Sequence, residues 1–115
     1  EEQEETLIAA SNYANSLTAL RRFEEAKLLL RRTMPVALRV LGGNHEYTLM
    51  LRKTYGRALS KDPGATLDDV REAVTTLEDA DPIARRVLGS SNPVAIAIEF
   101  FLRQARAALQ GAQRR

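Results

Sequence analysis

The chain has 115 residues, of which 44% are hydrophobic and 28% are charged, and its formal net charge is +2. This composition is that of one soluble globular domain, and it excludes a disordered chain. No apolar run approaches the ~20 residues that a membrane-spanning helix needs. The absence of cysteine excludes a disulfide framework and a thiolate site, and it is compatible with the cytoplasmic location that we expect. Few aromatic residues and many alanines and leucines favour helices over strands.

The two ends of the chain carry opposite charge. Four of the first five residues are acidic, whereas the last thirteen include Arg103, Arg106, Arg114 and Arg115. Acidic residues at the start of a helix and basic residues at its end both complement the helix dipole. The acidic opening is unlike a secretory signal peptide, and we expect the sequence to be a fragment of a longer protein.

The first predicted helix covers about residues 3–20. Its apolar stripe consists of Leu7, Ala10, Ala14, Leu17 and Leu20. Only Arg21-Arg22 separate it from a second helix, which starts at Phe23 and ends at Gly42-Gly43. Two helices with so short a connection form an antiparallel hairpin.

Three further helices follow. Asn44 is predicted to cap the third, which runs to about Ser60 and is followed by the turn Asp62-Pro63-Gly64. Thr66 and Asp69 resemble a capping box that starts the fourth helix, and Gly89 stops it. Asn92-Pro93 then opens a fifth helix to about Gln110, with Gly111 at its end. No segment alternates as a strand does, so the predicted fold class is all-α with about five helices.

One pattern of eight residues occurs twice, at 35–42 and at 82–89. Six positions are identical: Pro, Ala, Arg, Val, Leu and Gly. The offset of 47 residues, from Pro35 to Pro82, lies within the range of stacked helical repeats. Both prolines fall inside predicted helices, so we expect a kink in each.

The two units also share their spacing of large and small residues. Tyr13-Ala14 and Tyr55-Gly56 place a large residue before a small one in the first helix of each pair, and Ala26 and Ala73 lie early in the second. This spacing resembles the tetratricopeptide repeat. The tyrosines are 42 residues apart and the alanines 47, so the second unit carries five extra residues, which we place in the turn 60–66.

The first unit is similar to the kinesin light chain class of this repeat. The segments that carry the similarity are Asn12-Tyr13-Ala14, Arg22-Phe23-Glu24-Glu25-Ala26 and Leu41-Gly42 followed by His45. The resemblance implies a right-handed superhelical array of antiparallel helix pairs. Repeat 1 covers about 6–43, repeat 2 about 44–90, and a half repeat or capping helix about 91–111. It also implies a non-catalytic adaptor or scaffold that binds a protein partner and needs no cofactor.

In this family an extended peptide binds the concave face, which is lined by the first helix of each pair. The positions that correspond in this chain, with one neighbouring amide, are Ser11, Asn12, Asn15, Lys53, Arg57 and Lys61. The three basic residues stand four apart and project from one helix face, which predicts a groove for an acidic or carboxylate-ended peptide. Asn12 and Asn15 offer hydrogen bonds to a peptide backbone. The alternative is a solvated helix face that binds nothing.

Other functions have weaker support in the sequence. His45 is the single histidine and stands beside a glycine turn, so we interpret it as a capping or inter-helix residue and expect no catalytic or metal site. The pairs Arg21-Arg22, Arg31-Arg32 and Arg85-Arg86 are dispersed and lack interleaved aromatic residues, which disfavours nucleic acid. Self-association through Phe100, Phe101 and Leu102 remains the alternative function, because a short array leaves apolar end faces uncovered.

Overall fold

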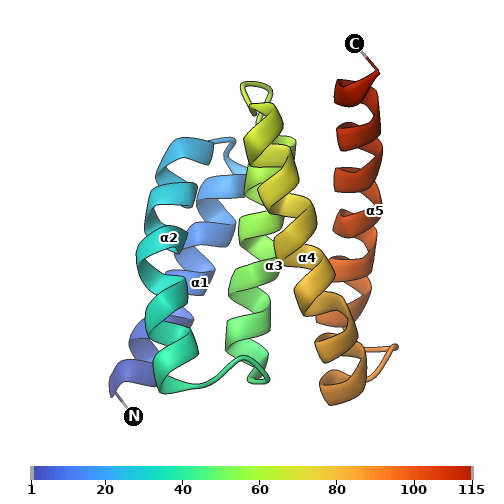
Figure 1. The fold of residues 1–115 in the computed structure, drawn as a ribbon. Helices are drawn as coiled ribbons and strands as arrows, with labels where there is room; N and C mark the ends of the chain where they lie inside the picture. The colour runs from blue at the N-terminus through green and yellow to red at the C-terminus, as the bar shows by residue number, and fades with distance from the viewer. Residues whose placement is uncertain (1, 115) are drawn as a thin grey trace.

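The computed structural model describes residues 2–114, apart from the side chain of Glu2. Glu1 and Arg115, which contribute to the charged ends, lie outside the described residues. The described chain forms five helices and no strand: α1 (Glu2–Ala19), α2 (Phe23–Val40), α3 (Glu46–Lys61), α4 (Leu67–Leu88) and α5 (Pro93–Gln113). The all-α prediction is therefore confirmed. Figure 1 shows α1 with α2 and α3 with α4 as two antiparallel pairs, followed by α5.

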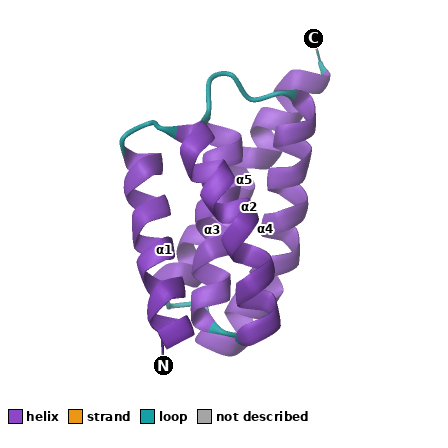
Figure 2. Cartoon of the chain, turned by 90° about the vertical axis from the view of Figure 1, so that its left-hand side faces the viewer, coloured by secondary structure: helices purple, strands orange, loops and turns teal. Residues whose placement is uncertain are grey.

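The first helices of the units lie side by side. α1 packs against α2 and α3. α3 also packs against α2, α4 and α5, and α4 packs against α5. α3 is therefore the central helix, and α1, α3 and α5 form one layer. The turns after α1 and α3 lie at one end of the molecule together with the C-terminus, and the turns after α2 and α4 lie at the other (Figures 1 and 2).

The core explains why a small residue follows a tyrosine in each unit. A Cβ atom added to Gly56 of α3 would lie 2.5 Å from Cγ of Leu77 of α4, which is 0% exposed. The backbone of α3 therefore lies so close to the Leu77 side chain that an alanine at position 56 would fit only if neighbouring atoms moved. The positions that correspond in the first pair, Ala14 and Leu30, are both 0% exposed in the same core cluster. In each pair, a small residue of the first helix and a leucine of the second helix are thus buried in the same core.

Most predicted helix ends are confirmed. Gly42 and Gly89 follow α2 and α4 with φ of +85° and +90°, a conformation that glycine adopts without strain. Thr66 and Asp69 form the predicted capping box, each accepting a backbone N–H of the other at 3.1 Å. Asn92 accepts the N–H of Val94 at 2.8 Å and caps α5.

Three local predictions are wrong. His45 rather than Asn44 caps α3, its Nδ1 accepting the N–H of Tyr47 at 3.1 Å, which also confirms the capping role expected for the histidine. α5 continues through Gly111 to Gln113, because a glycine without a left-handed φ lowers helix propensity but does not end a helix. Leu20 is 67% exposed, because it lies beyond the last residue of α1. α2 and α4 both continue through their prolines, as expected, and the kink at each proline stays a prediction.

The turn after α1 has the hydrogen bonds of a Schellman motif. The N–H of Arg22 donates to the carbonyl of Leu17 at 2.8 Å, and the N–H of Arg21 donates to that of Thr18 at 3.0 Å. Arg21 has a φ of +63° and is the one residue other than glycine with a positive φ in the described chain. An arginine therefore occupies the position at which glycine is usual.

Candidate functional site

Lys53, Arg57 and Lys61 follow one face of α3 and are called the basic row. The guanidinium of Arg57 lies over the ring of Phe101 of α5, 5.7 Å from its centroid. Arg57 and Lys61 also line a hollow of about 230 Å³ together with Thr18 and Ala19 at the end of α1. The basic row therefore lies between α1 and α5, on the surface of the layer that these two helices form with α3.

The charges of the basic row have no ion-pair partner among the described residues. Over residues 2–114, none of the three side chains has a carboxylate within 4.0 Å. Nε of Arg57 is buried and has no hydrogen-bond partner. Burial, together with the charge of Arg57, lowers the pKa of Lys53. An anion at this surface would supply the missing opposite charge.

Lys27 of α2 shows the opposite arrangement. Its side chain is 4% exposed, and its Nζ lies 2.7 Å from a carboxylate oxygen of Glu24, 3.2 Å from Asp62 and 3.9 Å from Asp69. Burial by itself would lower the pKa of Lys27, but the hydrogen bonds to Glu24 and Asp62 raise it above its usual value. This cluster joins α2, the turn after α3 and α4, so its role is structural.

Arg31 of α2 is also engaged. Its Nε donates to the hydroxyl of Tyr55 at 3.0 Å, and that hydroxyl donates to Glu72 of α4 at 2.6 Å. Burial and the hydrogen bond to Glu72 raise the pKa of Tyr55. Tyr55 thus connects α2 and α4 through the central helix, and Arg31 is not available to a ligand in the way that the basic row is.

The structure brings two of the groove residues expected from the sequence, Arg57 and Lys61, into one hollow. Ala19 of α1 lines the same hollow as Arg57 and Lys61. Asn15 and Asn12 lie four and seven positions before Ala19, hence on the same stripe of α1, and both are exposed. Ser11 is different: it is 3% exposed because α1 packs against both α2 and α3. It is therefore removed from the surface that a peptide can reach.

The residues proposed for self-association do not form one surface. Leu102 is 4% exposed and belongs to the core, so it is not available to a second chain. Phe101 is partly buried beneath Arg57 and packs edge-on against Phe100. Phe100 is 46% exposed, and Ile96, one turn earlier, is 53% exposed. These two side chains are the apolar surface that α5 presents to solvent.

Comparison with protein-family models matches residues 6–47 to the tetratricopeptide repeat. The matched segment covers α1, α2 and the start of α3. No curated protein and no solved structure matches the chain. Within residues 2–114, no helix combines the length and the apolar character needed to cross a membrane. In the same residues, no group of three or more His, Cys, Asp or Glu side chains is placed to hold a metal ion.

Proposed function

Because this chain is a tetratricopeptide repeat protein, we propose that it is a non-catalytic adaptor or scaffold module that binds an extended, acidic segment of a partner protein. Repeats of this family generally mediate protein–protein interactions. The proposed binding surface is the layer of α1, α3 and α5, with the basic row at its centre. We further propose a cytoplasmic setting and membership of the kinesin light chain class, on the resemblance of the first unit.

The observation that carries this proposal is the unpaired charge of the basic row. Some cations of the helix pairs have carboxylate partners: Lys27 has three, and Arg22 has Glu25 at 2.7 Å. Within residues 2–114, several cations have no such partner, among them Arg21 and Arg32 as well as the basic row. What distinguishes the basic row is that its three unpaired charges stand four apart on one helix face, where like charges destabilise the helix. Their repulsion is relieved when an anionic segment binds between them.

The spacing of the row also matches an extended peptide. Four residues of α-helix advance about 6 Å, and alternate side chains of an extended chain recur about every 6.6 Å on one face. A segment that runs along α3 with an acidic residue at every second position therefore meets each member of the row in turn. The exposed amides of Asn12 and Asn15 lie on the α1 side of this path and offer hydrogen bonds to the peptide backbone.

The double substitution Lys53→Glu/Arg57→Glu is expected to weaken the binding of a peptide with glutamate at alternate positions by at least about tenfold, because attraction becomes repulsion. Amide-resolved NMR titration measures this. In the wild type, shifts should cluster at Asn15, Lys53, Arg57 and Lys61 and should weaken with salt.

Two controls make this experiment specific. A peptide with glutamine at the same positions should bind weakly to both proteins. Arg32→Glu reverses an exposed charge on α2, outside the α1, α3 and α5 layer, and should leave the affinity within about twofold. Equal weakening by Arg32→Glu and by the double substitution would show that net charge rather than this groove determines binding.

Exposed Phe100 and Ile96 favour one alternative, a module that self-associates through α5. On this alternative, sedimentation velocity would show a larger species as concentration rises, and Phe100→Asp would restore the monomer because it places a charge in an apolar contact. We expect the wild type to remain a monomer, since two side chains provide less apolar surface than a stable interface needs. A dimer that Phe100→Asp dissociates would replace groove binding as the function.

A further inference from the structure

Arg21 occupies a position where its side chain is costly. The left-handed φ of +63° is unfavourable for a residue with a Cβ atom, and glycine holds the corresponding position after α2. Nothing in the Schellman hydrogen bonds of this turn requires a side chain, since they involve backbone atoms alone. Strain of this kind persists where a side chain has a use.

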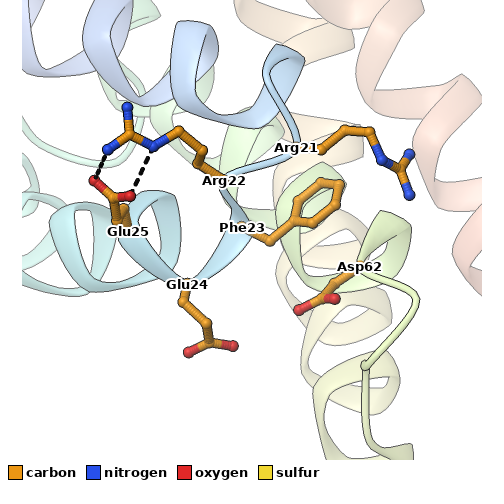
Figure 3. A pocket seen from close by; sticks show the side chains of 6 residues that line it. All are labelled: Arg21, Arg22, Phe23, Glu24, Glu25 and Asp62. Carbon is orange, nitrogen blue, oxygen red and sulfur yellow. Dashed lines mark hydrogen bonds and ion pairs between the residues drawn. The ribbon is translucent and has the colours of Figure 1, made fainter.

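Arg21 and Arg22 are directed to opposite sides of the turn (Figure 3). Arg22 donates two hydrogen bonds to Glu25, at 2.7 and 2.8 Å, and is neutralised by it. Arg21 extends away from Glu24 and Glu25, and its guanidinium lies 5.5 Å from the ring centroid of Phe23. Within residues 2–114, Arg21 has no carboxylate within 4.0 Å.

The nearby carboxylate of Asp62 is already engaged. It accepts the N–H of Gly64 at 2.8 Å, and it bonds Nζ of Lys27 at 3.2 Å. The bond from Gly64, and then that from Lys27, hold the pKa of Asp62 below its usual value, to which the charge of Arg21 also contributes. Asp62 therefore acts on Arg21 only through its charge and takes none of its hydrogen bonds, so the guanidinium keeps its hydrogen-bonding capacity.

Arg21 completes the hollow at the end of the basic row. The residues that line this hollow are Thr18, Ala19, Arg21, Phe23, Arg57 and Lys61. Three of them are cations and none is acidic. They come from the turn after α1 and from α3, and Phe23 and Phe101 lie against the two guanidinium groups. We call this feature the Arg21 hollow; its volume is about 230 Å³.

The charge of this hollow exceeds what one carboxylate balances. A phosphate monoester carries a charge of about −1.5 to −2 and three strong acceptor oxygens, and two guanidinium forks with one ammonium supply enough positive charge and enough donors for it. We propose that the Arg21 hollow binds a phosphate monoester on a serine or threonine of the segment held along the basic row. This inference rests on the proposed function and specifies its ligand as a phosphorylated acidic peptide.

The test compares three peptides that share the alternating glutamates and differ at the residue placed at the Arg21 hollow: serine, glutamate or phosphoserine. In the wild type, phosphoserine is expected to bind about tenfold tighter than serine, and glutamate only about two- to threefold tighter. In Arg21→Gly the advantage of phosphoserine over serine should be lost. This variant should keep or raise the midpoint of unfolding, because glycine relaxes the left-handed turn.

Arg22→Gln is the matched control, because it removes the neighbouring arginine that Glu25 already neutralises. It should keep the advantage of phosphoserine. A glutamate peptide that binds as tightly as phosphoserine, or an advantage that persists in Arg21→Gly, would overturn the phosphate assignment while leaving the acidic-peptide function intact.

Titration with inorganic phosphate separates the sources of the anion. If no peptide binds, the proposed function and this inference both fail. If no peptide binds but inorganic phosphate shifts the amide NMR signals of Arg21, Arg57 and Lys61, the hollow would be assigned to a free phosphate ion. Binding of the phosphoserine peptide at concentrations where inorganic phosphate produces no shift would support a ligand attached to the partner segment.

Discussion

Leu77→Ala is expected to lower the free energy of unfolding by about 3–4 kcal/mol, as measured by urea denaturation. Leu77 is 0% exposed and lies where α3 and α4 approach most closely, against Gly56. The loss combines the transfer of a buried isobutyl group with the cavity that it leaves. A loss below about 1 kcal/mol would show that the two helices close the space, and that their separation is not set by this side chain.

The same contact makes a second substitution informative. Gly56→Ala alone should cost about 1–3 kcal/mol, although alanine favours a helix over glycine, because its Cβ meets Leu77 at 2.5 Å. In the Leu77→Ala background the added methyl enters vacated space, so the double variant should be more stable than Leu77→Ala. Gly111→Ala is the control: it has open space around it and should be neutral or slightly stabilising. Additive losses at Gly56 and Leu77 would contradict the packing described.

Lys27→Met is expected to cost about 2–3 kcal/mol at neutral pH. Methionine keeps most of the buried stem but leaves Asp62 and Asp69 without their cation, and an uncompensated charge is what makes a broken buried pair costly. The partial exposure of both carboxylates keeps the loss below the largest values known for such pairs. Arg71→Met is the control, because its pair with Asp68 is exposed and should change stability by less than about 0.5 kcal/mol.

The difference in stability between the wild type and Lys27→Met depends on pH, and the pKa shifts of Asp62 and Lys27 give the sign of this dependence. The pKa of Asp62 is lowered in the folded state, so its contribution is present above its ordinary pKa and is lost as pH falls through the folded value. The pKa of Lys27 is raised, so its contribution is present below its ordinary pKa and is lost only as pH rises through the folded value. The gap between wild type and Lys27→Met should therefore be widest between these limits and should narrow below about pH 4. Thermal unfolding across that range measures it, and a gap that widens in acid would contradict this assignment.

Local signals made the helices predictable. The glycines after the second and fourth helices, the Thr66 capping box and Asn92-Pro93 depend on neighbouring residues alone, and each is confirmed. The errors arise where two local options compete or where tertiary contacts decide. Asn44 and His45 are both adjacent to the start of α3, and the turn places the histidine rather than the asparagine at the cap.

The candidate site was only partly predictable. The four-residue spacing correctly placed Lys53, Arg57 and Lys61 on one face, because helical periodicity fixes that relation. Ser11 was misplaced, since the width of the buried face of α1 depends on its packing against two other helices. The left-handed turn at Arg21 had no sequence signal, because arginine does not favour it.

Lys27 was missed, although the repeat offers a signal. An offset of 47 residues aligns it with Val74, which is buried in α4. A lysine at a position that is apolar in the other unit indicates a buried cation that needs acidic partners. Those partners lie 35 and 42 residues further along the chain, in Asp62 and Asp69, so no local pattern reveals them.

The Lys27 cluster has a consequence for how the molecule opens. Separating the first helix pair from the second would leave a buried ammonium and two carboxylates without their partners. We therefore expect α1 to α4 to unfold in a single cooperative transition. α5 is joined to α4 by the exposed pair Arg106–Glu78, which adds little to its apolar packing. Detachment of α5 is an opening of the native state that leaves the Lys27 cluster intact. Such an event removes Phe101 from Arg57 while the α1 side of the groove stays folded, which widens the path by which a partner segment enters.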